Sequence, residues 1–98
     1  MDQPNSPYSP YEVTCRALRN LILSHHPNET PTSVMVTGAG GINLGYLLWM
    51  MDQLQGFPEL GKRARWMGWV LAHAELAVGL TNEESRNLVR QDVKSGRE

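Results

Sequence analysis

Hydrophobic side chains recur at helical spacing along most of the chain and predict four helices. The first helix is preceded by Ser9-Pro10-Tyr11-Glu12, in which a serine N-cap, a proline in the first turn and a glutamate three residues after the serine form a capping box. The residues behind this box predict an amphipathic helix that ends before Pro27. Its apolar face consists of Val13, Ala17, Leu18, Leu21 and Ile22.

The second and third predicted helices, at about residues 43–55 and 58–78, each carry two rows of apolar side chains rather than one. A helix that buries a single face needs only one such row. In the second helix the rows are Leu44, Leu47, Leu48, Met51 and Leu54, and Tyr46, Trp49 and Met50. In the third they are Leu60, Ala64, Met67, Leu71, Ala74 and Val78, and Trp66, Val70, His73 and Ala77, with Trp69 near the edge.

The ends of these helices are marked by glycines and polar caps. Asn43 is the expected N-cap of the second helix, and a left-handed Gly56 is expected to stop it. Gly79 is the expected stop of the third helix, and the capping box Thr81–Glu84 opens a fourth. We therefore predict an all-α fold: a single small domain of about four helices and at most one short strand, spanning residues 9–94, with a flexible arm at 1–8 and a flexible tail at 95–98.

Charge and cysteine content narrow the class of protein. Nine Lys and Arg stand against ten Asp and Glu, a net charge of −1, whereas binding through nucleic-acid phosphates normally needs a basic excess. The single cysteine, Cys15, allows no internal disulfide, so a cytoplasmic location is the simplest expectation. The N-terminus does not resemble a secretory leader, and the longest apolar run, from Gly38 to Met51, is too short to span a bilayer, so no membrane contact is expected.

One long segment is almost free of charge, since Asp52 is the only charged residue between Glu29 and Glu59. A helix or strand with one face in solvent normally carries charged residues on that face. We therefore expect both sides of this segment to be covered by other parts of the protein or by a partner. Aromatic and methionine side chains are typical of interface cores, which favours a second chain as the cover, most simply in a homodimer. The alternative, that all of these side chains pack within one monomer, remains open. The expected interface residues are Leu44, Leu47, Leu48, Met51, Trp49, Trp66, Trp69, Val70 and His73.

The run Val34–Gly41 resembles the first strand and glycine turn of a dinucleotide-binding fold. The spacing does not match, because that pattern needs glycines where this chain has Ile42 and Leu44, and Gly45 falls one residue late. The residues that follow also read as helices rather than as βαβ units. We therefore expect no cofactor here, and a loop or short strand that enters a helix.

The residues that could support catalysis or metal binding do not combine into a recognisable site in the sequence. His25 and His26 are adjacent, so on a helix they point in different directions, and we expect them to stabilise the carbonyls of a helix end. His73 lies on an apolar row, and Cys15 has no CxxC partner. Glu83 and Glu84 are better explained as part of the helix cap at Thr81 than as catalytic acids or bases. We expect neither catalysis nor a metal site.

Direct DNA binding is the alternative function. Lys62, Arg63 and Arg65 form a short basic run, and a helix-turn-helix can be drawn from Val70 to Arg90. Its second helix would bring Glu83 and Glu84 to the duplex at the end that should read the bases, which is repulsive. Direct nucleic-acid binding is therefore the less favoured hypothesis.

The stretch 65–90 resembles a layout of small phage-like and prophage-like helical proteins, in which a Trp-x-Gly-aromatic helix leads to a Gly-Leu-Thr turn and a Glu-Glu-x-Arg helix. The matching residues are Trp66, Gly68, Trp69, Gly79, Leu80, Thr81, Glu83, Glu84 and Arg86. With its size and helicity, the whole chain resembles the small bacterial quorum-sensing anti-activators of the QslA type. This resemblance implies a dimeric helical protein that binds a LuxR-type transcription factor and blocks its dimerisation and DNA binding. We therefore expect a non-enzymatic inhibitor of a regulator.

Overall fold

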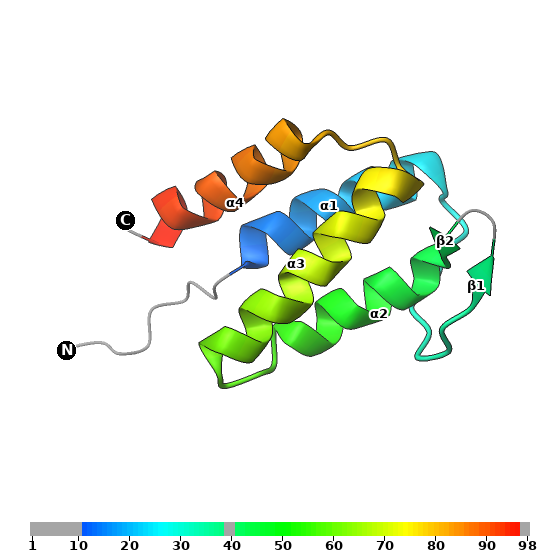
Figure 1. Cartoon of the computed structure of the whole chain (residues 1–98), viewed down its shortest axis with the longest axis horizontal. Helices are drawn as coiled ribbons and strands as arrows, with labels where there is room; N and C mark the ends of the chain where they lie inside the picture. Colours follow the sequence, from blue (N-terminus) through cyan, green and yellow to red (C-terminus); the bar gives the residue numbers. More distant parts are fainter. Residues whose placement is uncertain (1–10, 39–40, 97–98) are drawn as a thin grey trace.

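The computed structural model describes residues 11–38 and 41–96, and of residues 91–96 only the backbone. Four helices make up most of the described chain: α1 (Glu12–His25), α2 (Leu44–Leu54), α3 (Leu60–Ala77) and α4 (Asn82–Gly96) (Figure 1). The strands β1 (Thr37–Gly38) and β2 (Gly41–Ile42) form a short antiparallel pair just before α2. The predicted all-α fold is confirmed, although the single short strand expected before the second helix is a pair of two-residue strands.

The predicted flanking segments fall largely outside the described residues. The arm at 1–8 lies wholly outside them, as do residues 97–98 of the predicted tail. Helix α4 itself extends to Gly96, two residues beyond the predicted end of the helical domain.

The helices form two pairs, because α1 packs against α4 and α2 packs against α3 (Figure 1). The core lies where the pairs meet. The thiol of Cys15 on α1 is 3.8 Å from the sulfur of Met67 on α3. The buried apolar residues are Cys15, Leu18, Ile22, Leu44, Leu47, Leu48, Met50, Met51, Leu54, Met67, Val70 and Ala74.

The first helix begins later than the sequence predicted. Its N-cap is Tyr11 rather than Ser9, and Tyr11 has a left-handed backbone with φ of 72°. The amide of Cys15 donates the first helical hydrogen bond to the carbonyl of Tyr11, at 2.9 Å. A left-handed residue cannot continue a right-handed helix, so α1 starts only after it. Ser9 lies outside the described residues.

The two predicted glycine stops behave differently. Gly79 follows α3 with φ of 72°, as expected for the residue after a C-cap. The predicted left-handed Gly56 is wrong, because Gly79 is the only glycine with positive φ among the described residues. Helix α2 ends instead through tightened bonds from the amide of Gly56 to the carbonyl of Gln53 (3.0 Å) and from Phe57 to Leu54 (3.2 Å). Such a tight last turn needs no left-handed residue.

The charge-free segment is covered only in part. Helix α2 is largely buried, but the loop before it is open, with Val34 62 %, Met35 52 % and Val36 57 % exposed. Within the single chain this loop is therefore not covered on both sides. The loop is held by hydrogen bonds of its backbone rather than by burial, as in the bond from the amide of Thr32 to the carbonyl of Gly45, at 3.0 Å.

Candidate functional site

The paired helices α2 and α3 carry a continuous series of aromatic rings on one face. We call this series the aromatic ridge, and all of its rings are half-buried. It consists of Phe57, Trp66, Trp49, Tyr46, Trp69 and His73.

Each ring of the ridge contacts the next. The ring centroids are 4.6 Å apart for Phe57–Trp66, 6.2 Å for Trp66–Trp49, 5.4 Å for Trp49–Tyr46, 6.1 Å for Tyr46–Trp69 and 3.9 Å for Trp69–His73. The first and fourth pairs meet edge to face and the third is stacked, geometries in which aromatic pairs attract each other. These contacts hold the rings in place, so the ridge is preorganised for binding.

Helical spacing explains how the sequence builds the ridge. Tyr46 and Trp49 are three residues apart on α2, and Trp66 and Trp69 are three apart on α3, so each pair lies on one face of its helix. Packing of α2 against α3 brings the two pairs together. A cavity of about 310 Å³ is lined by Tyr46, Trp66 and Trp69 of the ridge, together with Met50 and Arg65.

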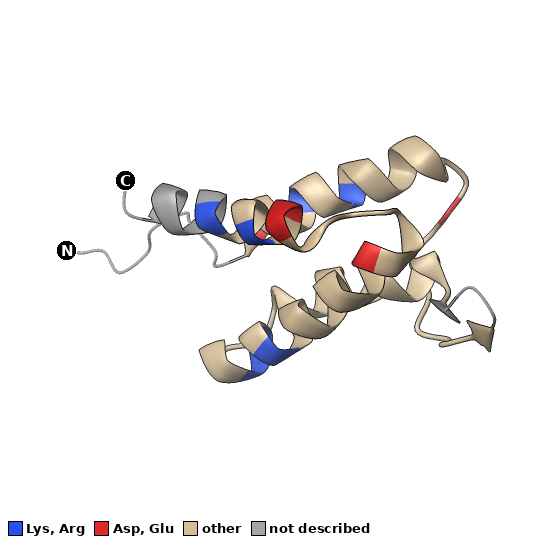
Figure 2. Cartoon of the chain, turned by 45° about the horizontal axis from the view of Figure 1, so that its top comes forward, with Lys and Arg blue, Asp and Glu red and all other residues tan. Residues whose placement is uncertain are grey.

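Figure 2 shows basic residues near the start of α3, the helix that carries Trp66 and Trp69. The ammonium of Lys62 lies 4.4 Å from the centroid of the Phe57 ring, a cation–π contact. Arg63 differs from its neighbours, since it is only 8 % exposed and its guanidinium donates to the carbonyl of Phe57. The basic run therefore does not form one solvated patch: one of its three charges fixes the turn between α2 and α3.

The nine predicted interface residues separate into two groups. Trp49, Trp66, Trp69 and His73 lie on the aromatic ridge. The other five lie in the core of the single chain, where this conformation leaves them out of reach of a partner: Leu44, Leu47, Leu48, Met51 and Val70. We do not carry these five into the proposed surface.

The sequence pattern missed two members of the ridge and misplaced the buried face of α3. Tyr46 lies in the second apolar row of α2 but is not among the expected interface residues, and neither is Phe57. The buried residues of α3 are Arg63, Met67, Val70 and Ala74. This face runs between the two predicted rows, and Leu60 is consequently 61 % exposed.

The other candidate residues lie apart from one another. His25 and His26 are exposed at the end of α1, whereas Cys15 is buried. Where the structure describes side chains, no three His, Cys, Asp or Glu residues gather as a metal site.

The helix pair of the DNA-binding alternative is α3 and α4. Glu83 and Glu84 are exposed in the first turn of α4, as expected. The Glu84 carboxylate accepts a hydrogen bond from the amide of Thr81, which lowers its pKa below the ordinary value of 4.5. This negative charge is therefore fixed at the end of α4 that would have to read bases.

Comparison of the chain with models of protein families, with curated proteins and with solved structures finds no match. Across its described residues, the chain has no helix of the length and apolarity needed to cross a bilayer.

Proposed function

We propose that this chain is a non-enzymatic protein-binding inhibitor that covers an apolar contact surface of its partner with the aromatic ridge. The unbroken series of half-buried rings is the observation that carries this proposal. The Phe, Trp and Tyr rings pack inward on the core and leave their outer parts to be buried by a second protein. Aromatic side chains dominate the centres of protein interfaces, and polar residues form the rim. Lys62 and Arg65 are placed to act as such a rim.

The proposed partner is a LuxR-type transcription factor in the cytoplasm. The resemblance of the chain to QslA-type anti-activators supports this choice. A regulator that dimerises through an apolar surface offers a complement to the ridge. An inhibitor bound there would keep the regulator from dimerising and hence from binding its operator.

We further propose that the free chain is a homodimer in which two ridges face each other. A twofold axis repeats the same patch on both chains, so a single self-complementary surface suffices. Trp66 and Trp69 would then be shielded by a second copy, and the regulator would compete with that copy for the ridge.

The inhibitor proposal is tested by operator binding of a LuxR-type receptor in a gel-shift titration with this protein. Wild-type chain in excess should abolish the receptor–operator complex. Trp66→Ala and Trp69→Ala should each require at least about tenfold more protein, since a central aromatic contributes about 2 kcal/mol or more to an interface. Leu76→Ala is the matched control, because Leu76 is 79 % exposed and lies off the ridge.

Unchanged operator binding at excess wild-type protein would refute the proposed partner. Light scattering tests the homodimer separately, and a mass of one chain at micromolar concentration would refute it. In the same gel-shift assay, direct binding of this chain to random duplex, weakening steeply with salt, would support the DNA-binding alternative.

A further inference from the structure

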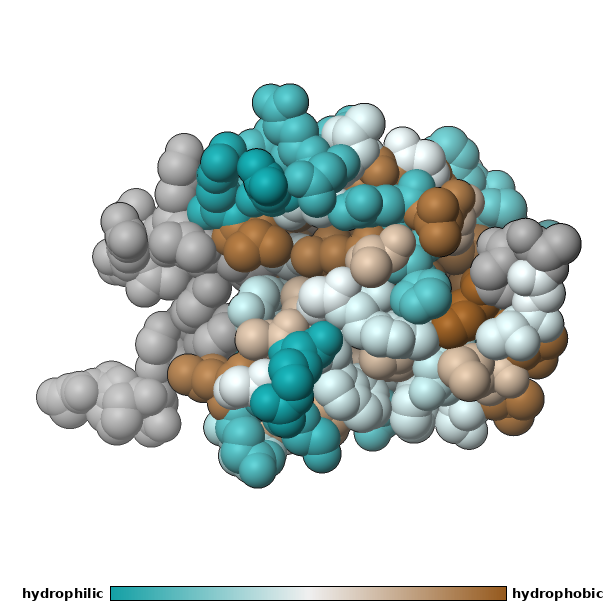
Figure 3. Space-filling view, viewed as in Figure 1, coloured by the Kyte–Doolittle hydropathy of each residue, from teal (hydrophilic) through white to brown (hydrophobic). Residues whose placement is uncertain are grey.

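A second open surface lies between α3 and α4, which we call the α3–α4 groove. Helix α4 packs against α1, where the Thr14 hydroxyl donates to the carbonyl of Leu88 at 3.2 Å. This leaves a cavity of about 590 Å³ on the side of α4 that faces α3. Figure 3 shows a band of hydrophobic surface between these two helices, bordered by hydrophilic side chains.

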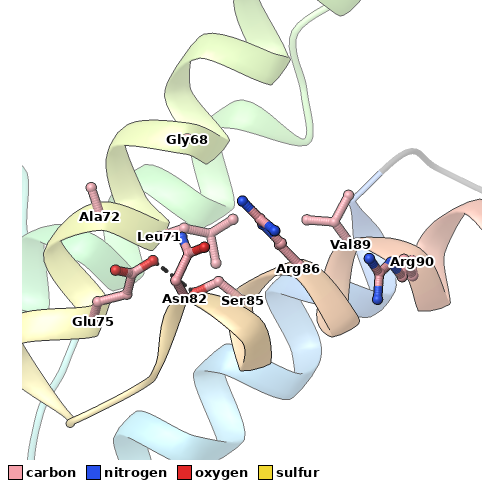
Figure 4. Close-up of a pocket in the computed structure, with 9 residues that line it drawn as sticks. All are labelled: Gly68, Leu71, Ala72, Glu75, Asn82, Ser85, Arg86, Val89 and Arg90. Atoms are coloured by element: carbon pink, nitrogen blue, oxygen red, sulfur yellow. Dashed lines mark hydrogen bonds between the residues drawn. The ribbon is translucent and has the colours of Figure 1, made fainter.

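The groove has an apolar floor, and on the α3 side it is bordered by small residues. Leu71 of α3 and Val89 of α4 are half-buried in it (Figure 4). Gly68 and Ala72 are exposed one turn apart on α3, and a Cβ added at Gly68 would meet nothing within 4 Å. Small residues on a helix face let the backbone of another helix approach closely. The shape of the groove therefore fits a helix.

The charges of the groove are divided between its two ends. Figure 4 shows Arg86 and Arg90 of α4 at one end and Glu75 of α3 at the other. The Glu75 carboxylate is engaged within the chain, since it accepts a hydrogen bond from the buried Ser85 hydroxyl at 3.1 Å. Among the residues whose side chains the structure describes, the Arg90 guanidinium donates to the neighbouring Asn87 side chain, and neither Arg86 nor Arg90 forms an ion pair. The open end of the groove is thus basic.

We infer that the α3–α4 groove binds an amphipathic, acidic helix of a partner protein. The apolar stripe of that helix packs on Leu71 and Val89, as in other helix-in-groove complexes. Two of its carboxylates, one turn apart, face Arg86 and Arg90, which are also one turn apart on α4. Charge complementarity at this end favours an acidic helix over a basic one.

The groove is separate from the aromatic ridge. Gly68 follows Trp66 by two residues, and positions two apart on a helix point to nearly opposite sides. One partner can therefore occupy both surfaces, or two partners can bind at once. The inference goes beyond the proposed function and does not depend on it.

The test uses a fluorescently labelled synthetic helix of about 18 residues, long enough to be partly helical in isolation. It carries a stripe of Leu at positions i, i+3, i+4 and i+7, and beside this stripe pairs of Glu that are four residues apart. A second peptide has Lys in place of every Glu. Fluorescence anisotropy with the full chain should show binding of the acidic peptide and at least about tenfold weaker binding of the basic one.

Variants locate the binding on the groove. Arg86→Glu with Arg90→Glu should weaken binding of the acidic peptide at least about tenfold. Gly68→Leu should weaken it similarly by filling the groove without changing charge. Arg16→Glu is the charge control for Arg86→Glu alone, since each reverses one charge. Arg16 is exposed on α1, and Arg16→Glu should bind as wild type does. Trp66→Ala should also bind normally, which separates this test from that of the ridge.

Equal binding of the acidic and basic peptides would overturn the inference, as would unchanged binding by the double arginine variant. Light scattering of that variant tests whether the groove is instead occupied by a second copy of this chain. If Arg86→Glu with Arg90→Glu converts a dimer into a monomer, the groove holds a second copy of this chain and the inference is wrong.

Discussion

Thr81 and Glu84 cap each other at the start of α4. The amide of Thr81 donates to Glu84 Oε1 at 2.8 Å, and the amide of Glu84 donates to Thr81 Oγ1 at 3.1 Å. This reciprocal pair is the capping box that the sequence predicted, and it satisfies amides that the first turn of a helix leaves unpaired. It also fixes the start of the helix that forms one wall of the α3–α4 groove.

Removing the Thr81 hydroxyl should destabilise the fold. We expect Thr81→Ala to lower the free energy of unfolding by about 1 kcal/mol, the usual cost of losing an N-cap side chain. Thr81→Ser keeps the hydroxyl and should stay close to wild type. Urea unfolding followed by circular dichroism measures both, and equal midpoints for Thr81→Ala and wild type would show that the box contributes nothing to stability.

The capping box also predicts how stability depends on pH. Hydrogen bonds from Thr81 lower the pKa of Glu84 in the folded state below its ordinary value of 4.5. Between these two values the unfolded chain binds more protons than the folded one, so stability falls as the pH falls from about 4.5 through the lower folded pKa. Glu84→Gln cannot titrate and should lose less stability over this interval than wild type. Parallel losses in a series of urea titrations would contradict this assignment.

Some short-range patterns correctly predicted where a helix starts or ends, and others did not. The Thr81 cap and the Gly79 stop depend on residues within one or two turns, and both were predicted. The Ser9 capping box and the left-handed Gly56 were predicted from local patterns as well, but α1 starts after a left-handed Tyr11 and α2 ends in a tight turn. The sequence of α3 has two rows of apolar residues, and either row could have been the buried face. Packing against the other helices buries a face that runs between the two rows and includes Arg63. The ridge was therefore predicted in part, through Trp49, Trp66, Trp69 and His73.

Asn43 illustrates the same limit and gives a third prediction. It occupies the predicted N-cap position of α2, but its side chain makes no capping bond. Its Oδ1 instead accepts from the amide of Val36 at 2.8 Å, and its Nδ2 donates to the carbonyl of Val34 at 3.1 Å. Asn43→Ala should therefore release this loop, with faster hydrogen exchange at the amide of Val36.

The conservative change at the same position is the control. Asn43→Asp keeps the oxygen that accepts from Val36 and loses only the donor to Val34, so its exchange rate should lie between those of wild type and Asn43→Ala. Global stability should fall by no more than about 1 to 2 kcal/mol in Asn43→Ala, the value of one or two exposed hydrogen bonds. Unchanged exchange at Val36 would show that Asn43 does not hold the loop.

Two glycines in helices should respond oppositely to alanine. At Gly45 an added Cβ would lie 2.5 Å from the carbonyl oxygen of Thr30 and 3.0 Å from Thr32 Cγ2, so the backbone must shift. We expect Gly45→Ala to cost about 1–3 kcal/mol, as overpacking does. Gly68 has open space around it in the interior of α3, so Gly68→Ala should stabilise the fold by about 0.5–1 kcal/mol through helix propensity. Thermal unfolding of the pair tests both signs, and a stabilised Gly45→Ala would show that the loop does not press on α2.

The contact between Met67 and Cys15 links the two helix pairs, and its loss should be costly. Both side chains are 1 % exposed, so Met67→Ala leaves a cavity that α1 and α3 cannot close without moving. We expect a loss of about 2–5 kcal/mol in the free energy of unfolding, a large fraction of what a domain of this size has. Leu76→Ala removes an apolar side chain of similar size from the exposed face of the same helix and should change stability by less than about 0.5 kcal/mol. Faster labelling of the Cys15 thiol by a disulfide reagent in Met67→Ala would report the same opening of the core. Equal effects of the two substitutions would mean that the α1–α4 and α2–α3 pairs are not joined through Met67.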